Sequence, residues 1–584
     1  MTLFSPLTAS LRPLPAPSLR QQEVVFCLIL SLLAPLYFGL ISWHYVASAP
    51  VTQPIIQDDA RLHISWLQRL MDPALFPNDI AADYYAATQS VGFKAIYGLA
   101  AAFGLEPLMV AQGLPVILAL VTTIYLFWVS LRLLPIPLCG VLTTLILNQN
   151  IWLKDDLISA TPRAFVYPLF AAFLYYLLER ATLSWLIILV LQGLFYPQMM
   201  MVSAGILALR LVQWRGILPK RFAAYQEWPF AEAMAMLVAL GLAVAMLLFF
   251  SHQVEAQLGP VISAEEMRQM PEFQVNGRRQ YFGVSPLQFW FGGASGLRLP
   301  LFPPIILLGT LLPVAIIKKF SLAPNLTAQT RILPELLLSA LGLFLLAHLL
   351  FPKLYLPSRY TFYSLRFLMA IATGLMLTLV LDWSRRWLHQ RQQWQWGDGV
   401  KVTVGVGVAI AILTVPAIPP LFLSCQGWIV GETPRIYQYL AQTPKDTLVA
   451  SLDPDASNIP TFAQRSVWVS GEFALPYHAD FYQTMLERME VLVKAQYSTD
   501  MEEVRSFVQA SGIDQWIVHQ TFTDPDYLME QSWLINSSIQ STVAAIAKQL
   551  HKGQEPALLS IIPSCTVLED NRRLLLDAYC LKAQ

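Results

Sequence analysis

Long apolar stretches separated by short polar loops dominate the first 423 residues. A stretch of roughly 20 apolar residues is long enough to cross a bilayer as a helix. Counting these stretches predicts about eleven spans, although several are short or contain proline, as at Pro197 and Pro313. The predicted spans lie at 24–43, 108–131, 136–148, 163–178, 183–198, 199–212, 230–250, 302–317, 332–351, 363–381 and 400–423.

The first apolar stretch, Val24 to Trp43, carries no charge. Ala47-Ser48-Ala49 has the small residues of a signal-peptide cleavage site. The apolar run is too long for a signal peptide, however, and Pro50 follows the would-be cut. We therefore expect a short N-terminal tail, 1–23, followed by a retained first helix.

The polarity of the chain changes near Cys425. Thr447–Leu452 and Gln515–Val518 have the pattern of short buried strands, and Asp480–Gln496 and Met501–Ala510 have helical periodicity with charged faces. The predicted fold class is a polytopic α-helical membrane domain, 24–423, followed by a small soluble α/β domain, 424–584.

Composition agrees with a membrane protein. Of 584 residues, 55% are hydrophobic and 13% are charged, and the mean hydropathy is +0.50. Soluble domains carry about 25% charged residues. The net charge is zero, so nucleic acid is not an expected partner.

Basic residues predict how the chain is oriented in the cell (inner) membrane. With a cytoplasmic N-terminus, one set of loops carries most of the basic groups and obeys the positive-inside rule: Arg132, Arg180, Arg215 with Lys220-Arg221, Lys318-Lys319 and Arg385-Arg386. The same alternation places Asp58-Asp59, Asp155-Asp156, the loop 251–301 and the C-terminal domain outside the cytoplasm.

The chain has five cysteines and neither a CxxC pair nor the Cys/His spacing of a zinc site. Cys565 and Cys580 can form a disulfide if the C-terminal domain faces an oxidising compartment. The alternative is that Cys580 is a free thiol in the core.

The first acidic loop, Gln57 to His63, is the strongest candidate for chemistry. After Asp58 and Asp59, an apolar face predicts an amphipathic helix on the membrane surface, with both carboxylates at its N-terminus. Such a carboxylate is suited to act as a base, and Arg61 and His63 lie within one turn to bind phosphate or tune its protonation. The alternative is purely structural, with one aspartate capping the helix and the other pairing with Arg61.

A second acidic pair, Asp155-Asp156, precedes Thr161-Pro162-Arg163, where Thr161 is predicted to cap the next helix. In the predicted topology this loop opens on the same side as the first. Two acidic pairs, each followed by an arginine, suggest a shared site. A local ion-pair network of Lys154 and Arg163 is the alternative.

Basic groups are available on the same side. Arg359, Tyr360 and Arg366 open the tenth predicted span, with the two arginines on one helix face. Arginine binds phosphate with two hydrogen bonds, although arginines at a helix end also reach the interface simply to stay hydrated.

In the loop 251–301, Arg278-Arg279-Gln280-Tyr281 and Phe289-Trp290-Phe291-Gly292-Gly293 suit a lid over sugar or lipid. An interfacial aromatic belt is the alternative interpretation of these segments.

Two other motifs carry little weight. Asp453-Pro454-Asp455 has the DxD spacing of soluble nucleotide-sugar transferases but lacks their surrounding nucleotide-binding layout. Gly405-Val406-Gly407 lies inside an apolar span, so it is not a dinucleotide-binding loop.

The order of these features resembles the GT-C membrane glycosyltransferases, in particular bacterial members related to the dolichyl-phosphate-mannose protein mannosyltransferases and the lipid A aminoarabinose transferases. The resemblance covers about 24–423 and is carried by Gln57 to Trp66, Asp72-Pro73 and Phe76-Pro77-Asn78-Asp79. It implies that Asp58 or Asp59 activates the acceptor. By the same resemblance, Asp155 and Asp156 form the second acidic loop and Arg163, Arg359 and Arg366 hold phosphate. The Ala60-Arg61 continuation and the C-terminal domain depart from the eukaryotic mannosyltransferases, so sugar and acceptor do not carry over.

We therefore expect an inverting transfer of a sugar from a polyprenyl-phosphate donor to a glycan, lipid or protein acceptor on the outer face of the membrane. A divalent cation is compatible with such a site but is not required. The alternatives are an oligosaccharide ligase or polymerase, a flippase or transporter of lipid-linked sugars, and a scaffold without activity. A transporter would place ionisable residues at mid-bilayer, whereas here they gather at the outer surface.

Overall fold

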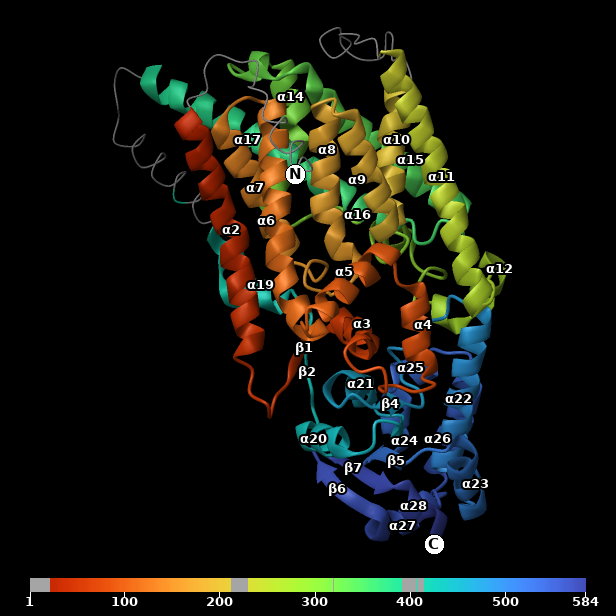
Figure 1. Ribbon diagram of the computed structural model, residues 1–584. Helices are drawn as coiled ribbons and strands as arrows, with labels where there is room; N and C mark the ends of the chain where they lie inside the picture. The colour runs from red at the N-terminus through yellow and green to blue at the C-terminus, as the bar shows by residue number, and fades with distance from the viewer. Residues whose placement is uncertain (1–20, 212–228, 319, 391–406, 408–413, 584) are drawn as a thin grey trace.

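The computed structural model describes residues 21–211, 229–318, 320–390, 407 and 414–583. Membrane helices form one end of an elongated molecule and the C-terminal domain forms the other (Figure 1). The predicted span at 400–423 lies largely outside the described residues. Its last part is the short helix α19 (Pro419–Ser424).

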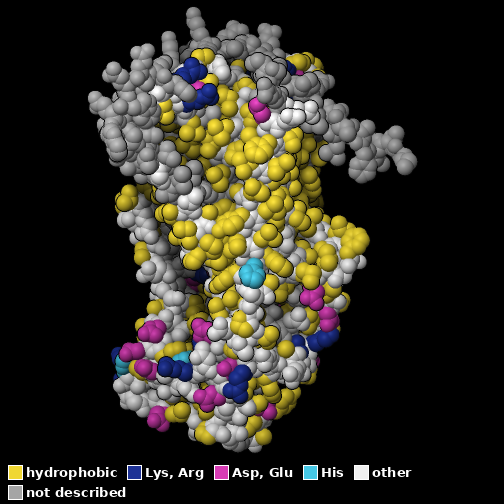
Figure 2. All heavy atoms as spheres, turned by 90° about the vertical axis from the view of Figure 1, so that its left-hand side faces the viewer, with side chains coloured by type: hydrophobic (Ala, Val, Ile, Leu, Met, Phe, Trp, Pro, Cys, Tyr) yellow, Lys and Arg dark blue, Asp and Glu magenta, His cyan; other side chains and the backbone are white. Residues whose placement is uncertain are grey.

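Among the described residues, five helical segments are long and apolar enough to cross a membrane. They identify an integral multi-pass membrane protein. Figure 2 shows the corresponding surface, where hydrophobic side chains cover the middle of the molecule and charged ones gather at its two ends. The long segments contain α2 (Gln21–Ala47), α6 (Pro107–Leu133), α11 (Phe230–Leu258), α15 (Ile332–Leu349) and α17 (Ser364–Gln390).

The other predicted spans are shorter helices, so the expectation of about eleven full spans holds only in part. Prolines shorten several of them: α9 and α10 meet at Tyr196-Pro197, and a 3₁₀ segment begins at Pro304. The sequence prediction missed α5, whose 12 residues are too few to cross a bilayer. These shorter elements are α5 (Val91–Ala102), α7 (Pro137–Trp152), η2 (Pro162–Phe165) with α8 (Val166–Leu178), α9 (Thr182–Phe195), α10 (Pro197–Leu211), η4 (Pro304–Leu311) with α14 (Leu312–Ile317), and α16 (Ser358–Phe362).

The described loops sort to two ends as predicted, while Arg215, Lys220 and Arg221 lie outside the described residues. At the end far from the C-terminal domain, Arg132 pairs with Glu179 and Arg180 pairs with Glu232 at 2.7 Å. Both acidic loops lie at the opposite end, beside the C-terminal domain. This shared placement is confirmed, while the side of the membrane that each end faces stays a prediction.

The C-terminal domain is built on a five-stranded mixed sheet of order β4-β3-β5-β7-β6. The first three strands in this order are parallel to one another. Strand β7 runs antiparallel to both of its neighbours, β5 and β6. The α/β prediction is confirmed here, with strands and helices within a few residues of the expected positions. The strands are β3 (Leu448–Ser451), β4 (Ser466–Val467), β5 (Gln515–His519), β6 (Thr566–Asp570) and β7 (Arg573–Asp577).

Helices cover this sheet and connect it to the membrane region. Tyr84, in a helix between the first two long spans, stacks on Phe481 of the domain with ring centroids 3.8 Å apart. The packing makes the domain and the membrane helices one continuous core. The helices are α20 (Pro434–Gln442), α21 (Ile459–Phe462), α22 (Ala479–Tyr497), α23 (Met501–Ser511), α24 (Pro525–Glu530), α25 (Ser532–Ile535), α26 (Gln540–His551), α27 (Leu558–Cys565) and α28 (Ala578–Ala583).

A two-stranded antiparallel ribbon joins the beginning and the end of the membrane region. Strand β1 (Ile55–Gln57) pairs with β2 (Trp428–Val430). The Asp58 amide then donates to the Gly427 carbonyl at 2.9 Å. The first acidic helix therefore starts from a point fixed by residues that lie far along the chain.

Cys565 and Cys580 form a disulfide with a Cα–Cα distance of 5.5 Å. The bond joins the end of α27 to α28, next to the edge of the sheet. The disulfide prediction is confirmed, and the interpretation of Cys580 as a free core thiol is wrong.

Candidate active site

A cavity of about 550 Å³ lies where the membrane helices meet the C-terminal domain. This volume is within the range of small-molecule sites. Its wall comes from α3 (Asp58–Leu67), α4 (Ile80–Thr88), the η2 turn, the α9–α10 junction, α11, the segment 351–359 and the segment 475–478. Elements from the whole length of the chain therefore build one chamber.

Helix α3 begins at Asp58, as the sequence predicts, but an aspartate does not cap it. The side chain of Gln57 accepts a hydrogen bond from the Ala60 amide at 3.0 Å. Both carboxylates of the acidic pair are therefore free of the capping role that was the structural alternative.

The position of α3 differs from the prediction of a helix on an open membrane surface. Leu62, Trp66 and Leu67 are buried, and α21 of the C-terminal domain packs against the helix. The Thr461 hydroxyl donates to the Arg61 carbonyl at 2.6 Å. The sequence pattern predicted the apolar face, but not that another domain covers the helix.

The two aspartates of the pair have different surroundings. Asp59 lines the cavity and pairs with Arg163. Asp58 does not line it and pairs with Arg61 at 2.7 Å, while Arg61 also lies 3.4 Å from Glu472. This difference separates two residues that the sequence leaves equivalent.

The pKa values of the pair move in opposite directions. Burial raises the pKa of Asp58, and Arg61 only partly offsets this. Burial also opposes ionisation of Asp59, but Arg163 and His63 together hold its pKa well below the usual range. Asp59 is therefore a carboxylate at any physiological pH.

The second acidic loop joins the same network behind the cavity wall. Asp156 is buried, pairs with Arg366 at 2.7 Å and lies 3.7 Å from Arg163. Burial opposes its ionisation, but Arg366 and Arg163 hold its pKa below the usual value. For half-buried Asp155, burial and then the Asp156 charge raise the pKa. The two predicted acidic loops thus converge on one arginine, Arg163.

The η2 turn positions Arg163. Thr161 occupies the N-cap position with Pro162 in the first turn, as predicted, but its side chain makes no capping hydrogen bond. Its hydroxyl instead accepts a hydrogen bond from Arg163 Nε at 3.1 Å and lies 2.7 Å from the Ser159 hydroxyl. The threonine therefore orients the guanidinium towards the carboxylates.

His63 lies one turn after Asp59 and lines the cavity. Its Nδ1 is 2.7 Å from Nε2 of Gln89, and burial lowers its pKa to about 4. The ring is therefore neutral at neutral pH and is held in place by the glutamine amide.

Of the three predicted residues near the tenth span, one lines the cavity and two lie behind its wall. Arg359 lines the cavity. Arg366 lies behind the wall, stacked 3.8 Å from the Phe362 ring centroid. Tyr360 does not line the cavity, because its hydroxyl is turned to the Leu354 carbonyl at 2.9 Å.

Sequence analysis missed most of the aromatic wall. Tyr84, Tyr85, Tyr196, Tyr355 and Tyr477 line the cavity, together with His478 and Lys353. They come from separate elements with no common motif, so no pattern along the chain marks them.

The loop 251–301 contributes in two ways. Arg279 lines the cavity, and Arg278 pairs with Glu472 of the C-terminal domain. Trp290 and Phe291 are exposed, as expected of residues at a membrane interface. The first segment thus contributes to the cavity, and the second has the exposure of an aromatic belt.

Among the described residues, no group of three or more His, Cys, Asp or Glu side chains is arranged to hold a metal ion. Arginines, instead, occupy the positions around Asp59 and Asp156.

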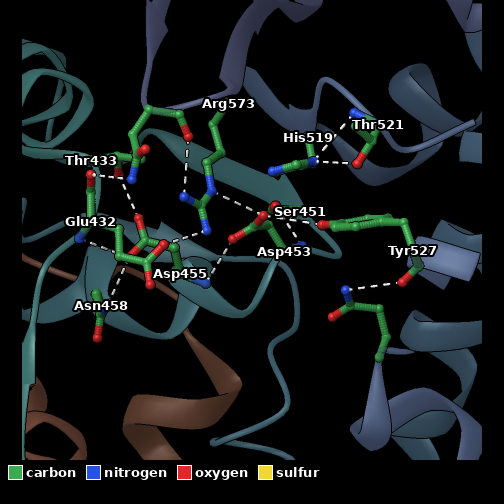
Figure 3. Close-up of polar contacts among 12 residues, drawn as sticks. Glu432, Thr433, Ser451, Asp453, Asp455, Asn458, His519, Thr521, Tyr527 and Arg573 are labelled. Carbon is green, nitrogen blue, oxygen red and sulfur yellow. Dashed lines mark hydrogen bonds and ion pairs between the residues drawn. The ribbon is translucent and has the colours of Figure 1, made fainter. Parts of the chain in front are cut away.

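The DxD motif of the C-terminal domain has a structural role. Asp453 accepts from Arg573 Nε and the Tyr527 hydroxyl, both at 3.1 Å, and Asp455 accepts from the Tyr437 hydroxyl at 2.6 Å and Asn458 Nδ2 at 2.8 Å. Figure 3 shows these carboxylates surrounded by side chains of their own domain. Asp455 also accepts from the Glu432 amide and the Thr433 hydroxyl, which holds the linker after β2, while Asp453 is bound to Arg573 of β7.

Comparisons with known proteins give a likeness of fold. No family model and no curated protein matches the chain. The crystal structure of the Archaeoglobus fulgidus oligosaccharyltransferase tethered to an acceptor peptide matches with a TM-score of 0.52 and 12% identity, over 91% of this chain and 72% of that one. Its apo form matches with a TM-score of 0.51 and 11% identity, over 91% and 73%. The fold of this chain is therefore similar to that of this archaeal protein over most of its length.

Proposed function

We propose that this protein is a membrane glycosyltransferase that transfers a sugar from a polyprenyl-phosphate-linked donor to an acceptor. The observation that carries the proposal is the pairing of Asp59 with Arg163 in a cavity that Arg279 and Arg359 also line. An ionised carboxylate beside several guanidinium groups provides both a proton acceptor and a site for a departing phosphate.

In the proposed reaction the acceptor hydroxyl or amine attacks the anomeric carbon of the donor. The bond from that carbon to the phosphate oxygen breaks, and the phosphate leaves with the bonding electrons. The arginines stabilise the negative charge that develops on the leaving group. A single displacement of this kind inverts the anomeric centre.

Asp59 is the proposed base. Its low pKa makes it a weak base towards a resting hydroxyl. The attacking oxygen becomes strongly acidic as its new bond forms, however, so the proton moves late in the displacement to a carboxylate held in contact with it. Asp58 is turned to Arg61 and is assigned only a supporting role.

One wall of the cavity supports a lipid-linked donor. Leu247, Phe250 and Val254 of α11 line it, while Leu248 and Phe249 of the same helix are exposed. Since α11 is one of the membrane-crossing helices, an isoprenoid chain in the bilayer can lie alongside it with its phosphate in the cavity.

His63 and Tyr84 belong to the proposed sugar and acceptor side of the cavity. The neutral imidazole and the phenol offer hydrogen bonds without adding charge, which suits the hydroxyl groups of a sugar. Arg61, Asp155, Asp156 and Arg366 are proposed to hold the cavity residues in place. The relationship to the bacterial mannosyltransferases and aminoarabinose transferases stays a prediction.

The test is a comparison of cells with and without the gene. Mass spectrometry of lipid-linked sugars and of surface glycans should show a donor that accumulates and a sugar modification that disappears. The wild-type gene should restore both, and a gene encoding Asp59→Asn should restore neither. Unchanged lipid-linked sugars and glycans in the deletion strain would contradict the proposal.

A further inference from the structure

Two arginines in the cavity have no carboxylate partner. Among the described residues, neither Arg279 nor Arg359 has a carboxylate oxygen within ion-pair distance, 4.0 Å. Arg359 donates only to the Tyr363 hydroxyl at 3.4 Å, and Arg279 lies 5.8 Å from the centre of the Tyr477 ring. The Nε atoms of both arginines are buried and without a hydrogen-bond acceptor.

The nearby acids are already used. Asp59 is held by Arg163, and Asp156 by Arg366. Glu472 lies between Arg278 and Arg61. Among the described residues Asp59 is the only carboxylate that lines the cavity, and Arg163 matches it. Arg279 and Arg359 are therefore left as guanidinium groups without a carboxylate, and Lys94 and Lys353 add further positive charge to the wall.

Burial of a guanidinium group without a hydrogen-bond acceptor lowers the stability of the fold, because the group loses its water and gains no partner. The two groups repel each other as well, since each lies within electrostatic range of the other. An occupant with two negative charges close together would relieve both costs. A phosphodiester has one such charge, whereas the diester of a diphosphate has two.

We infer that the cavity binds a diphosphate, so that the donor is a polyprenyl-diphosphate-linked sugar rather than a monophosphate-linked one. This inference rests on the proposed function and assigns the leaving group of the reaction. Arg359 and Arg279 each take one phosphate of the pair, and Arg163 stays with Asp59. Arginine is suited to this role because its planar fork donates two parallel hydrogen bonds to phosphate oxygens.

The test uses the purified full-length protein and two diester probes with the same isoprenoid chain. These are the farnesyl methyl diester of diphosphate, with two negative charges, and farnesyl methyl phosphate, with one. We expect the diphosphate to bind at least about tenfold more tightly, which corresponds to one additional charge-assisted contact. Arg279→Gln and Arg359→Gln should each reduce this preference to about threefold or less. Arg572→Gln, at an exposed position of the C-terminal domain, is the matched control and should retain it.

Arg359→Lys keeps the positive charge but cannot donate two parallel hydrogen bonds. Its preference for the diphosphate probe should lie between those of the wild type and Arg359→Gln, and such a value would show that the glutamine variant does not lose the preference by misfolding. Equal affinity for the two probes would overturn the diphosphate inference and leave the proposed transferase standing with a monophosphate donor. A preference that survives both glutamine substitutions would overturn the assignment to these arginines. Failure of both probes to bind would contradict the proposed function itself.

Discussion

Arg61 donates a hydrogen bond from its guanidinium to the side-chain oxygen of Asn458 at 2.9 Å, across 397 residues of sequence. Asn458 in turn donates to Asp455 at 2.8 Å. The amide therefore connects the helix of the acidic pair to the polar network of the C-terminal domain shown in Figure 3.

Asn458→Ala should lower the free energy of unfolding by about 1–3 kcal/mol, because Arg61 and Asp455 each lose a partner in a buried place. The thermal midpoint of the purified protein measures the effect. Asn536→Ala is the control, since that half-buried side chain donates only to the Ser532 carbonyl of its own local turn. Equal midpoints for the two variants would show that the contact does not stabilise the domain interface.

Asp59→Asn should reduce transfer by about a hundredfold or more, the usual contribution of a general base. Asp58→Asn should reduce it by less than about tenfold, because Arg61 keeps its contacts with Asn458 and Glu472. Initial rates in proteoliposomes distinguish them. The assignment of the base fails if the Asp58 variant is the more damaged of the two.

Stability should fall as the pH drops from about 6.5 towards 4. Burial holds the pKa of His63 at about 4, whereas an unfolded histidine has a pKa of about 6.5. The unfolded chain therefore binds the proton more readily within this window, and His63 accounts for up to about 3 kcal/mol of the loss.

His63→Gln should make that fall shallower, as measured by thermal midpoints at pH 7, 6, 5 and 4.5. His478, whose pKa burial also lowers to about 4, titrates in the same window, so some decline remains in the single variant. Identical slopes in wild type and variant would show that His63 is not held neutral.

The disulfide predicts how many cysteines a thiol reagent labels before and after reduction. Denatured but unreduced protein should label at Cys27, Cys139 and Cys425 only, and at all five cysteines after reduction. The bond closes a separation of 15 residues. Its removal by Cys580→Ser should cost about 3 kcal/mol, chiefly by freeing the unfolded chain. Five labelled cysteines without reduction would exclude the bond.

Labelling of introduced cysteines with a membrane-impermeant maleimide tests the orientation of the protein in the membrane. In a Cys425→Ser background, Glu555→Cys in the C-terminal domain should label in intact cells. Lys318→Cys, at the far end of the helices, should label only after permeabilisation. Labelling of both positions in intact cells, or of Lys318→Cys alone, would contradict the orientation on which the outer-face chemistry depends.

The sequence predicted the parts of the site that local patterns encode. A charged pair before an apolar helical face located α3, and alternating spans placed both acidic loops at one end. The pattern did not distinguish Asp58 from Asp59, because that choice depends on the rotation of α3, which the β1–β2 ribbon sets.

The remaining walls come from contacts between distant segments. Tyr477 and His478 reach the cavity because their segment pairs with the chain after α11, where the Ile262 amide donates to the Tyr477 carbonyl at 3.0 Å. A short pairing of this kind has no periodic signature. The missing capping hydrogen bond at Thr161 has a similar origin, since the hydroxyl accepts from Arg163 rather than from the backbone of its own turn.

The β1–β2 ribbon also determines when during synthesis the chamber can form. Residues 55–57 leave the ribosome early, but their partners at 428–430 emerge only after the membrane helices have been made, and Tyr477 and His478 follow later still. When every described long span has been inserted, the nascent chain still lacks the segments at 428–430 and 475–478. Its chamber therefore lacks part of the wall, and the start of α3 is not yet fixed by the ribbon. The chamber can therefore close only after the ribbon has paired and the C-terminal domain has packed against the membrane helices.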